Sequence, residues 1–167
     1  MWRFVMGCRC MSTEFSVLGT GGEHLVCADL IRNGYWAYFT SAALPYDVVL
    51  DAGGKLLRVQ VKTAVEVRPR SANRPRKVYR FYAKNIDKCV DLMAFVALDI
   101  FSVAYIPLEL CPSGLNLDGP DPEPHFNKKG PKTGCKTFTD FPLALALWHH
   151  NKQHVAFRDG VFVHVNR

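Results

Sequence analysis

The segment PYDVVLDAGGKLLRVQVKT, residues 45–63, decides the fold because it encodes a complete β-hairpin. Two apolar runs, 47–51 and 56–67, flank a turn formed by the residues Asp-Ala-Gly-Gly at 51–54. The second run alternates, with Leu57, Val59 and Val61 on one face and Arg58, Gln60 and Lys62 on the other. This pattern predicts a strand whose apolar face is buried and whose polar face holds Gln60 and Lys62 beside Asp47 of the neighbouring strand.

The rest of the chain predicts a mixed arrangement of helices and strands. We expect a helix over 19–34, further strands at 35–40, 78–83, 92–100 and 102–110, a helix over about 139–151 and a hairpin over 155–165. The 167-residue length suits one domain at 19–167, preceded by an N-terminal arm at 1–18 and carrying a long loop at 111–137. The fold class is therefore α/β, as a mixed α+β sheet.

Composition narrows the cellular setting. The chain is 49% hydrophobic and 22% charged, and no apolar run is long enough to cross a bilayer, so we expect no membrane contact. The first residues lack the pattern of a secretory signal, and translation starts at Met1 or at Met11. Six scattered cysteines favour a reduced, intracellular and cytoplasmic protein.

Positive charge is concentrated in one segment. The net charge is +6, which indicates an anionic partner, and residues 68–80 include six basic residues, two prolines and no acid. The segment reads either as a solvated loop or as a grip on a phosphate backbone. The residues for the second interpretation are Arg68, Arg70, Arg74, Arg76, Lys77 and Arg80.

The polar residues of the hairpin suit metal-assisted hydrolysis of a phosphodiester. Mg²⁺ prefers oxygen ligands, which Asp47, the Gln60 amide and the Val61 carbonyl can supply. Glu23, in the first turn of the expected helix, would hold a metal-bound water or a second ion. Lys62 would orient the attacking water and stabilise the transition state. Each residue alone is an ordinary cap or surface residue, but their joint order and spacing favour a site.

The series Glu23, Pro45-x-Asp47 and Gln60-x-Lys62 resembles the PD-(D/E)XK nuclease superfamily over roughly residues 19–106. The resemblance implies a restriction-endonuclease-like α-β-β-β-α-β core and an endonuclease activity. The chain is similar both to Holliday junction resolvases and to the group I intron homing endonucleases of this fold. Gln60, which stands where most members have an acid, fits the homing group. Ser41 either corresponds to a resolvase serine near the scissile phosphate or is an ordinary loop serine.

These observations together predict a Mg²⁺-dependent DNA endonuclease, with Mn²⁺ as a substitute metal. The DNA is duplex or branched, and its contacts would be Ser41 and the basic residues of 68–80. Cutting two strands calls for two sites, so we expect a homodimer or tetramer, of prokaryotic or phage type. The alternative is a non-catalytic DNA-binding module on the same scaffold.

Overall fold

The computed structural model describes the backbone of residues 11–41, 43–65, 68–71, 74–118, 126–127, 130–131, 136–150, 155–158 and 161–164. The side chains it describes belong to residues 16–41, 43–65, 78–118 and 136–150. The elements are α1 (Met11–Arg32), β1 (Trp36–Phe39), β2 (Val48–Asp51), β3 (Leu56–Ala64), β4 (Arg68–Ser71), β5 (Arg74–Tyr82), β6 (Leu92–Ala97), β7 (Ser102–Pro107), η1 (Leu108–Leu110), β8 (Gly114–Leu117), β9 (Phe126–Asn127), β10 (Gly130–Pro131), η2 (Phe138–Asp140), α2 (Leu143–His150), β11 (Val155–Arg158) and β12 (Val161–His164).

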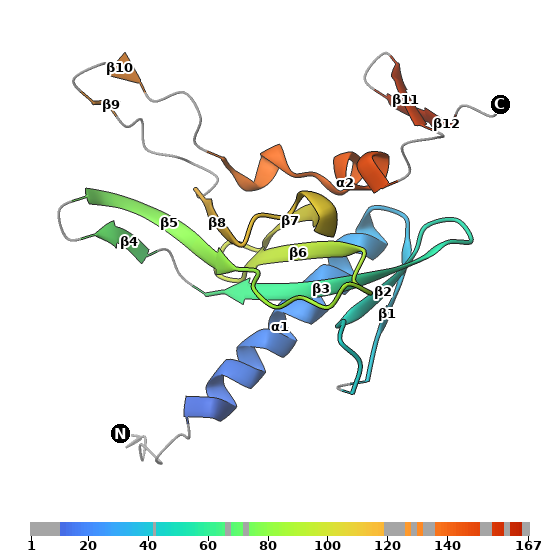
Figure 1. Ribbon diagram of the computed structural model, residues 1–167, viewed down its shortest axis with the longest axis horizontal. Helices are drawn as coiled ribbons and strands as arrows, with labels where there is room; N and C mark the ends of the chain where they lie inside the picture. The colour runs from blue at the N-terminus through green and yellow to red at the C-terminus, as the bar shows by residue number, and fades with distance from the viewer. Residues whose placement is uncertain are drawn as a thin grey trace, which may run out of the picture.

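A five-stranded mixed sheet, in the order β1-β2-β3-β6-β7, organises the fold (Figure 1). All neighbours in it are antiparallel except β3 and β6, which run parallel from Val59↔Leu92 to Ala64↔Ala97. A second sheet has the strand order β4-β5-β8. Strands β4 and β5 belong to the connection between β3 and β6, and β8 comes after β7 in the chain. The expected mixed α+β fold class is confirmed, although β4 and β5, rather than a helix, occupy the described part of the β3–β6 connection.

Both faces of the central sheet are buried, because alternate residues of β6 pack into different cores. Leu92, Ala94 and Val96 join Val26 and Leu30 of α1 in one core. On the opposite face, the core contains Met93, Phe95 and Ala97 of β6 together with residues of β5 and β8, namely Tyr79, Phe81, Leu115 and Leu117. Burial on both faces explains the nearly continuous apolar sequence of β6. Helix α1 therefore covers one side of β3, and β5 lies on the other.

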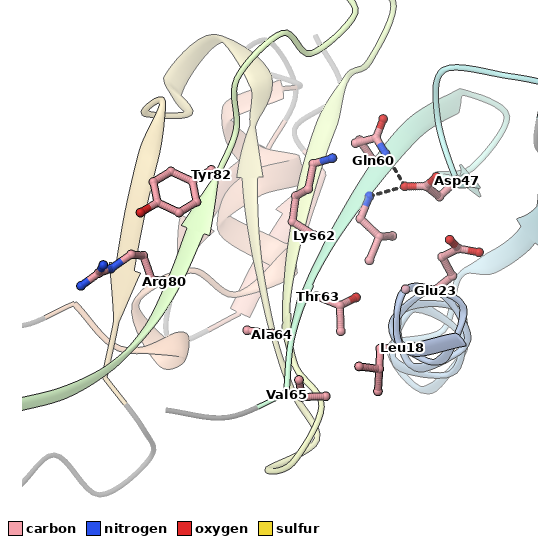
Figure 2. Close-up of a pocket in the computed structure, with 12 residues that line it drawn as sticks. Leu18, Glu23, Asp47, Gln60, Lys62, Thr63, Ala64, Val65, Arg80 and Tyr82 are labelled. Carbon is pink, nitrogen blue, oxygen red and sulfur yellow. Dashed lines mark hydrogen bonds between the residues drawn. The ribbon is translucent and has the colours of Figure 1, made fainter. Parts of the chain in front are cut away.

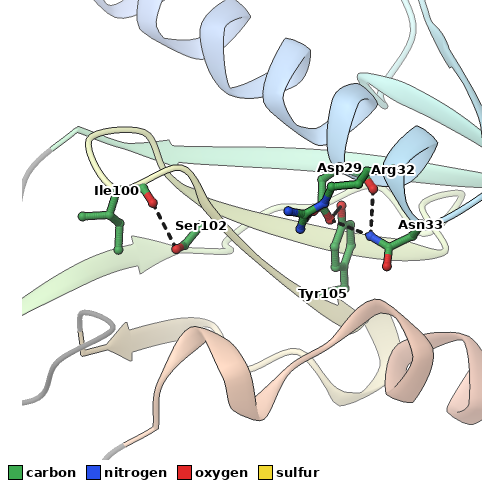
Figure 3. A network of polar contacts seen from close by, with 6 residues as sticks. All are labelled: Asp29, Arg32, Asn33, Ile100, Ser102 and Tyr105. Atoms are coloured by element: carbon green, nitrogen blue, oxygen red, sulfur yellow. Dashed lines mark hydrogen bonds and ion pairs between the residues drawn. The ribbon is translucent and has the colours of Figure 1, made fainter.

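The end of α1 is tied to the far strand β7 by a polar network (Figure 3). Asp29 Oδ2 accepts a hydrogen bond of 2.9 Å from the Tyr105 hydroxyl, and Asp29 Oδ1 accepts one of 2.8 Å from Arg32. Burial and the nearby Asp29 carboxylate raise the pKa of Tyr105, so its hydroxyl keeps its proton and acts as the donor. The network fixes the helix across the sheet and so fixes the position of residues earlier in α1.

Three sequence-based expectations about elements were wrong. Helix α1 begins at Met11 rather than Gly19, because the glycines taken as a start signal lie inside the helix, so residues 11–18 of the expected arm are helical. The expected basic loop at 68–80 is instead formed by β4 and β5, with Pro69 in edge strand β4 at a register shift. The expected loop at 111–137 contains β8, which pairs with β5.

The hairpin expected over 155–165 is present as β11 and β12. No helix within the described ranges is long and apolar enough to span a membrane.

Candidate active site

The candidate site lies where strand β2 stops and strand β3 continues. Pairing between them runs from Asp51↔Leu56 to Val48↔Val59, and the next backbone bond, from Asp47 N to Val59 O at 2.9 Å, is the last. Strand β3 extends five residues further, to Ala64, and there β6 is its remaining neighbour in the described sheet. One edge of β3 is therefore open from Gln60 onward, and we call this edge the notch.

The carboxylate of Asp47 takes the place of the missing strand at the notch. Its Oδ2 accepts a hydrogen bond of 2.6 Å from the Val61 backbone N–H and one of 2.5 Å from Gln60 Nε2 (Figure 2). The other oxygen of Asp47, Oδ1, accepts no hydrogen bond from the described residues. Asp47 thus satisfies a backbone donor with one oxygen and leaves the second available to a ligand.

The carbonyl of Val61 faces the same notch. The carbonyls of Arg58 and Ala64 accept hydrogen bonds from Asp91 and Leu98, which flank β6, so the even-numbered residues of β3 direct their backbone groups toward β6. Because these groups alternate along a strand, Val61 directs its own toward the edge that β2 has left. An uncharged oxygen ligand is therefore present beside the Asp47 carboxylate.

Helix α1 brings Glu23 to the notch through an unusually close contact with β3. A Cβ placed on Gly22 would lie 1.9 Å from Thr63 Oγ1, so only glycine allows this approach. Burial of Glu23 and the negative charge of Asp47 raise the pKa of the Glu23 carboxyl, and His24 opposes the shift. The two carboxylates therefore repel each other across the notch, and a cation between them would relieve that repulsion.

A cavity of about 400 Å³ surrounds the open edge of β3. One wall is α1, with Leu18, Gly19 and Glu23, and the other is the end of β5, with Arg80 and Tyr82. Figure 2 shows Lys62 between the acidic residues and these two β5 residues. The Lys62 ammonium makes no hydrogen bond or ion pair with any residue in the described ranges. It is therefore available to an anion that enters the cavity.

The structure places six of the twelve site residues expected from the sequence in this cavity. Those that line it are Glu23, Asp47, Gln60, Val61, Lys62 and Arg80. Ser41 does not line it. Its exposed hydroxyl accepts a 3.4 Å hydrogen bond from the Ala43 N–H. The side chains of Arg68, Arg70, Arg74, Arg76 and Lys77 lie outside the described residues.

Among the lining residues that sequence reasoning missed, two have a side chain that can form hydrogen bonds, Thr63 and Tyr82. Thr63 directly follows Lys62, but its approach to α1 has no sequence signal beyond the glycines. Tyr82 follows the alternation of β5, in which Tyr79 and Phe81 are buried and Tyr82 points the other way. That alternation was the available signal for Tyr82.

The donor set at the notch suits a hard divalent cation. It consists of oxygen atoms, from the carboxylates of Glu23 and Asp47, the amide of Gln60 and the carbonyl of Val61. Gln60 now turns its Nε2 toward Asp47, so its amide has to rotate before Oε1 can serve as a ligand. The described residues contain no group of three or more His, Cys, Asp or Glu side chains that could hold a metal ion. At this site the third side chain beside Glu23 and Asp47 is the amide of Gln60. The residues fit Mg²⁺ as a set with two charged and two neutral oxygens.

Comparisons with known proteins give a family and a similar fold. A family model described as PD-(D/E)XK endonuclease matches residues 16–113, more than half of the chain, and that range includes every lining residue of the cavity. A solved structure of the bacterial homing endonuclease I-Ssp6803I is similar with a TM-score of 0.55 and 16% identity, covering 83% of this chain and 96% of that one. The Holliday junction resolvase Hjc of the archaeon Archaeoglobus fulgidus aligns with a TM-score of 0.36 and 14% identity, covering 56% and 84%. Among curated proteins none matches.

Proposed function

The chain belongs to the PD-(D/E)XK endonuclease family, and from this premise we propose that it is a Mg²⁺-dependent endonuclease that hydrolyses phosphodiester bonds of DNA. One observation carries the proposal. Two carboxylates, an amide and a lysine, from helix α1, the residue before β2 and strand β3, meet around one open strand edge inside a single cavity. A purely structural role would not require a lysine without a partner among the described residues next to two carboxylates that repel each other.

Lys62 is the residue that would act on the substrate. Its Nζ, with no partner among the described residues, can hold a non-bridging phosphate oxygen and orient the attacking water toward phosphorus. The same positive charge stabilises the extra negative charge that develops as the water attacks. Val59 and Val61 of β3 are buried, and Lys62 lies on the opposite face of that strand. The packing of the two valines therefore fixes the direction of the Lys62 side chain.

The metal ligands would be Asp47 through Oδ1, Glu23, the Gln60 amide oxygen and the Val61 carbonyl. When bound, Mg²⁺ or Mn²⁺ supplies charge neutralisation at the phosphate and lowers the pKa of a water molecule. Asp47 keeps Oδ2 on the Val61 N–H throughout, which holds the carboxylate in position. With two carboxylates instead of three, the site should bind metal more weakly than a member with an acid at position 60.

Arg80 and the rest of the basic strand β5 would hold the DNA backbone beside the site. Arg80 lines the cavity, and Arg74, Arg76 and Lys77 precede it along the same strand. Such contacts are electrostatic, so binding should weaken steeply as salt rises. Cleavage of both strands of a DNA requires two sites, and we therefore propose a homodimer or a higher even assembly, to be measured by sedimentation velocity.

The proposal is tested with purified protein and fluorescent linear duplex and four-way junction DNA. We expect cleavage with Mg²⁺ or Mn²⁺ and none with EDTA. Lys62→Ala and Asp47→Ala should each abolish cleavage, whereas Lys55→Ala, an exposed lysine in the β2–β3 turn, should cut normally. Cleavage by both site variants at the wild-type rate would refute the proposal.

The alternative, a non-catalytic DNA-binding module, is favoured by one observation. Gln60 replaces an acid and donates to Asp47, which gives the carboxylate a partner that needs no metal. This alternative predicts salt-sensitive DNA binding that is unchanged by EDTA and by Asp47→Ala, with no cleavage of either DNA.

A further inference from the structure

Tyr82 is a large aromatic side chain that the fold leaves uncovered. Its exposed fraction is 60%, whereas Tyr79 and Phe81 of the same strand are 1% and 3% exposed. Side chains alternate along a strand, so Tyr79 and Phe81 enter the core and Tyr82 faces the other way. Burial in the core therefore does not explain the aromatic ring at position 82.

The surroundings of Tyr82 leave space beside it. Its cross-strand partner on β8 is Gly114, which has no side chain to pack on the ring. The nearest atom to a Cβ placed on Gly114 is the Phe81 carbonyl oxygen at 4.0 Å, so that position borders open space. Tyr82 has no ring contact or side-chain hydrogen bond with any residue in the described part of the chain.

Tyr82 belongs to the same cavity as the candidate catalytic residues. It lines the β5 wall together with Arg80, opposite Glu23 on α1, and Lys62 lies between the two walls (Figure 2). The cavity volume of about 400 Å³ is within the range of small-ligand pockets, roughly 300–1,000 Å³. A phosphate held at Lys62 would thus have an aromatic surface and a guanidinium on one side.

We propose that Tyr82 stacks on an unpaired base next to the phosphate held at Lys62, and that this contact directs the protein to branched or partly single-stranded DNA. This inference rests on the proposed nuclease function. In an intact duplex the faces of the bases are covered by their neighbours, and only the base edges are accessible in the grooves. A tyrosine ring at the wall of a cavity can meet a base face only where the base has left the stack, as at a branch or a single-stranded flank.

The test measures binding to three DNAs that share one sequence around a 2-aminopurine base: a linear duplex, a forked duplex and a four-way junction. All are titrated in EDTA at 0.1 M salt, so that binding is observed without cleavage. Tyr82→Ala removes the ring and Tyr82→Phe keeps it. Tyr38→Ala is the matched control, because Tyr38 on β1 is also exposed, at 52%, and does not line the cavity.

We expect Tyr82→Ala to weaken binding to the fork and the junction about tenfold, as the loss of one stacked base requires, and to abolish quenching of 2-aminopurine. Binding to the linear duplex should change less than about twofold, and Tyr82→Phe and Tyr38→Ala should behave as wild type. The inference is overturned if Tyr82→Ala weakens all three DNAs equally or none of them, while the wild type still binds and cuts DNA. A wild type that binds no DNA would instead overturn the proposed function, and this inference with it.

Discussion

Replacement of Asp47 should separate its structural role from its chemical role. Asp47→Ala removes the acceptor for both the Val61 N–H and the Gln60 amide. The Gln60 side chain borders the cavity and can form a hydrogen bond with water instead, so losing its bond to Asp47 costs little stability. The Val61 N–H lies at the open strand edge and has no described strand partner there, so it loses a charge-assisted bond.

The expected cost of Asp47→Ala follows from that single bond. A hydrogen bond to a charged group contributes about 1.5–3 kcal/mol to stability, and an unsatisfied donor costs a similar amount. For a chain of this size, we expect the melting temperature to fall by roughly 3–12 °C. Asp47→Asn keeps an acceptor oxygen for the Val61 N–H, so it should lose less stability, yet it should lose metal binding as completely as Asp47→Ala.

The assay combines urea unfolding with calorimetric titration of Mg²⁺ and Mn²⁺ in the absence of DNA. Asp51→Ala is the matched control, because Asp51 also accepts a backbone N–H, from Gly54 at 2.9 Å, but in an exposed turn outside the cavity. It should cost well under the Asp47→Ala value and leave metal binding intact. If Asp47→Ala unfolds at the wild-type urea concentration, Asp47 does not cap the strand edge, and our account of the notch is wrong.

Three further outcomes are expected. Gln60→Glu should bind Mg²⁺ about tenfold more tightly or better, but in EDTA it should unfold at a lower temperature than the wild type. The loss of stability is expected because the substitution replaces a hydrogen-bond donor to Asp47 by a second negative charge. Thermal unfolding with and without metal measures the change in metal binding and the change in stability. Burial and Asp47 raise the Glu23 pKa above its ordinary value of 4.5, so the folded protein holds that proton more tightly than the unfolded chain and loses stability as pH rises past 4.5. Glu23→Gln should therefore gain stability over wild type at pH 7.5 but not at pH 4 in urea titrations, and an equal gain at both would contradict this. Gly22→Ala should lower the free energy of unfolding by about 1–3 kcal/mol, because the added methyl group would push α1 away from Thr63. Gly19→Ala, whose added methyl group would meet no atom within 4 Å, should not destabilise the protein. Equal urea midpoints for the two variants would refute the packing argument.

The hairpin and its alternation could be predicted because residues close in sequence determine them. Leu57, Val59 and Val61 are buried as the pattern indicated, and Asp47 and Gln60 meet because a short turn joins their strands. Local patterns of this kind require no knowledge of distant contacts. The convergence of the hairpin residues was therefore accessible from the sequence, although their chemical roles stay predictions.

The strand expected at 78–83 is present as the end of β5, but the earlier part of β5 and its pairing with the distant strand β8 were not predicted. Prolines and arginines at 68–77 are typical of a loop, but these residues are in strands because β4 pairs with the first part of β5. The last part of β5, from Tyr79 to Tyr82, pairs with β8, more than thirty residues later. The start of α1 was also missed because of a distant contact. Its glycines resemble a helix start in the sequence, but Gly22 lies inside the helix and allows the close approach of α1 to Thr63 on β3. Local propensity was overridden by packing in both cases.

Gln60 is best understood as a balance between metal affinity and stability of the metal-free protein. An acid at position 60 would put a third negative charge beside Glu23 and Asp47, where burial and the charge of Asp47 already raise the pKa of the Glu23 carboxyl. The amide avoids that repulsion and donates to Asp47 instead. It can still present an oxygen after rotation, so the ligand is kept at the cost of one charge. A site built in this way should be ordered before metal arrives, and its affinity for metal should depend on how readily the Gln60 amide leaves Asp47.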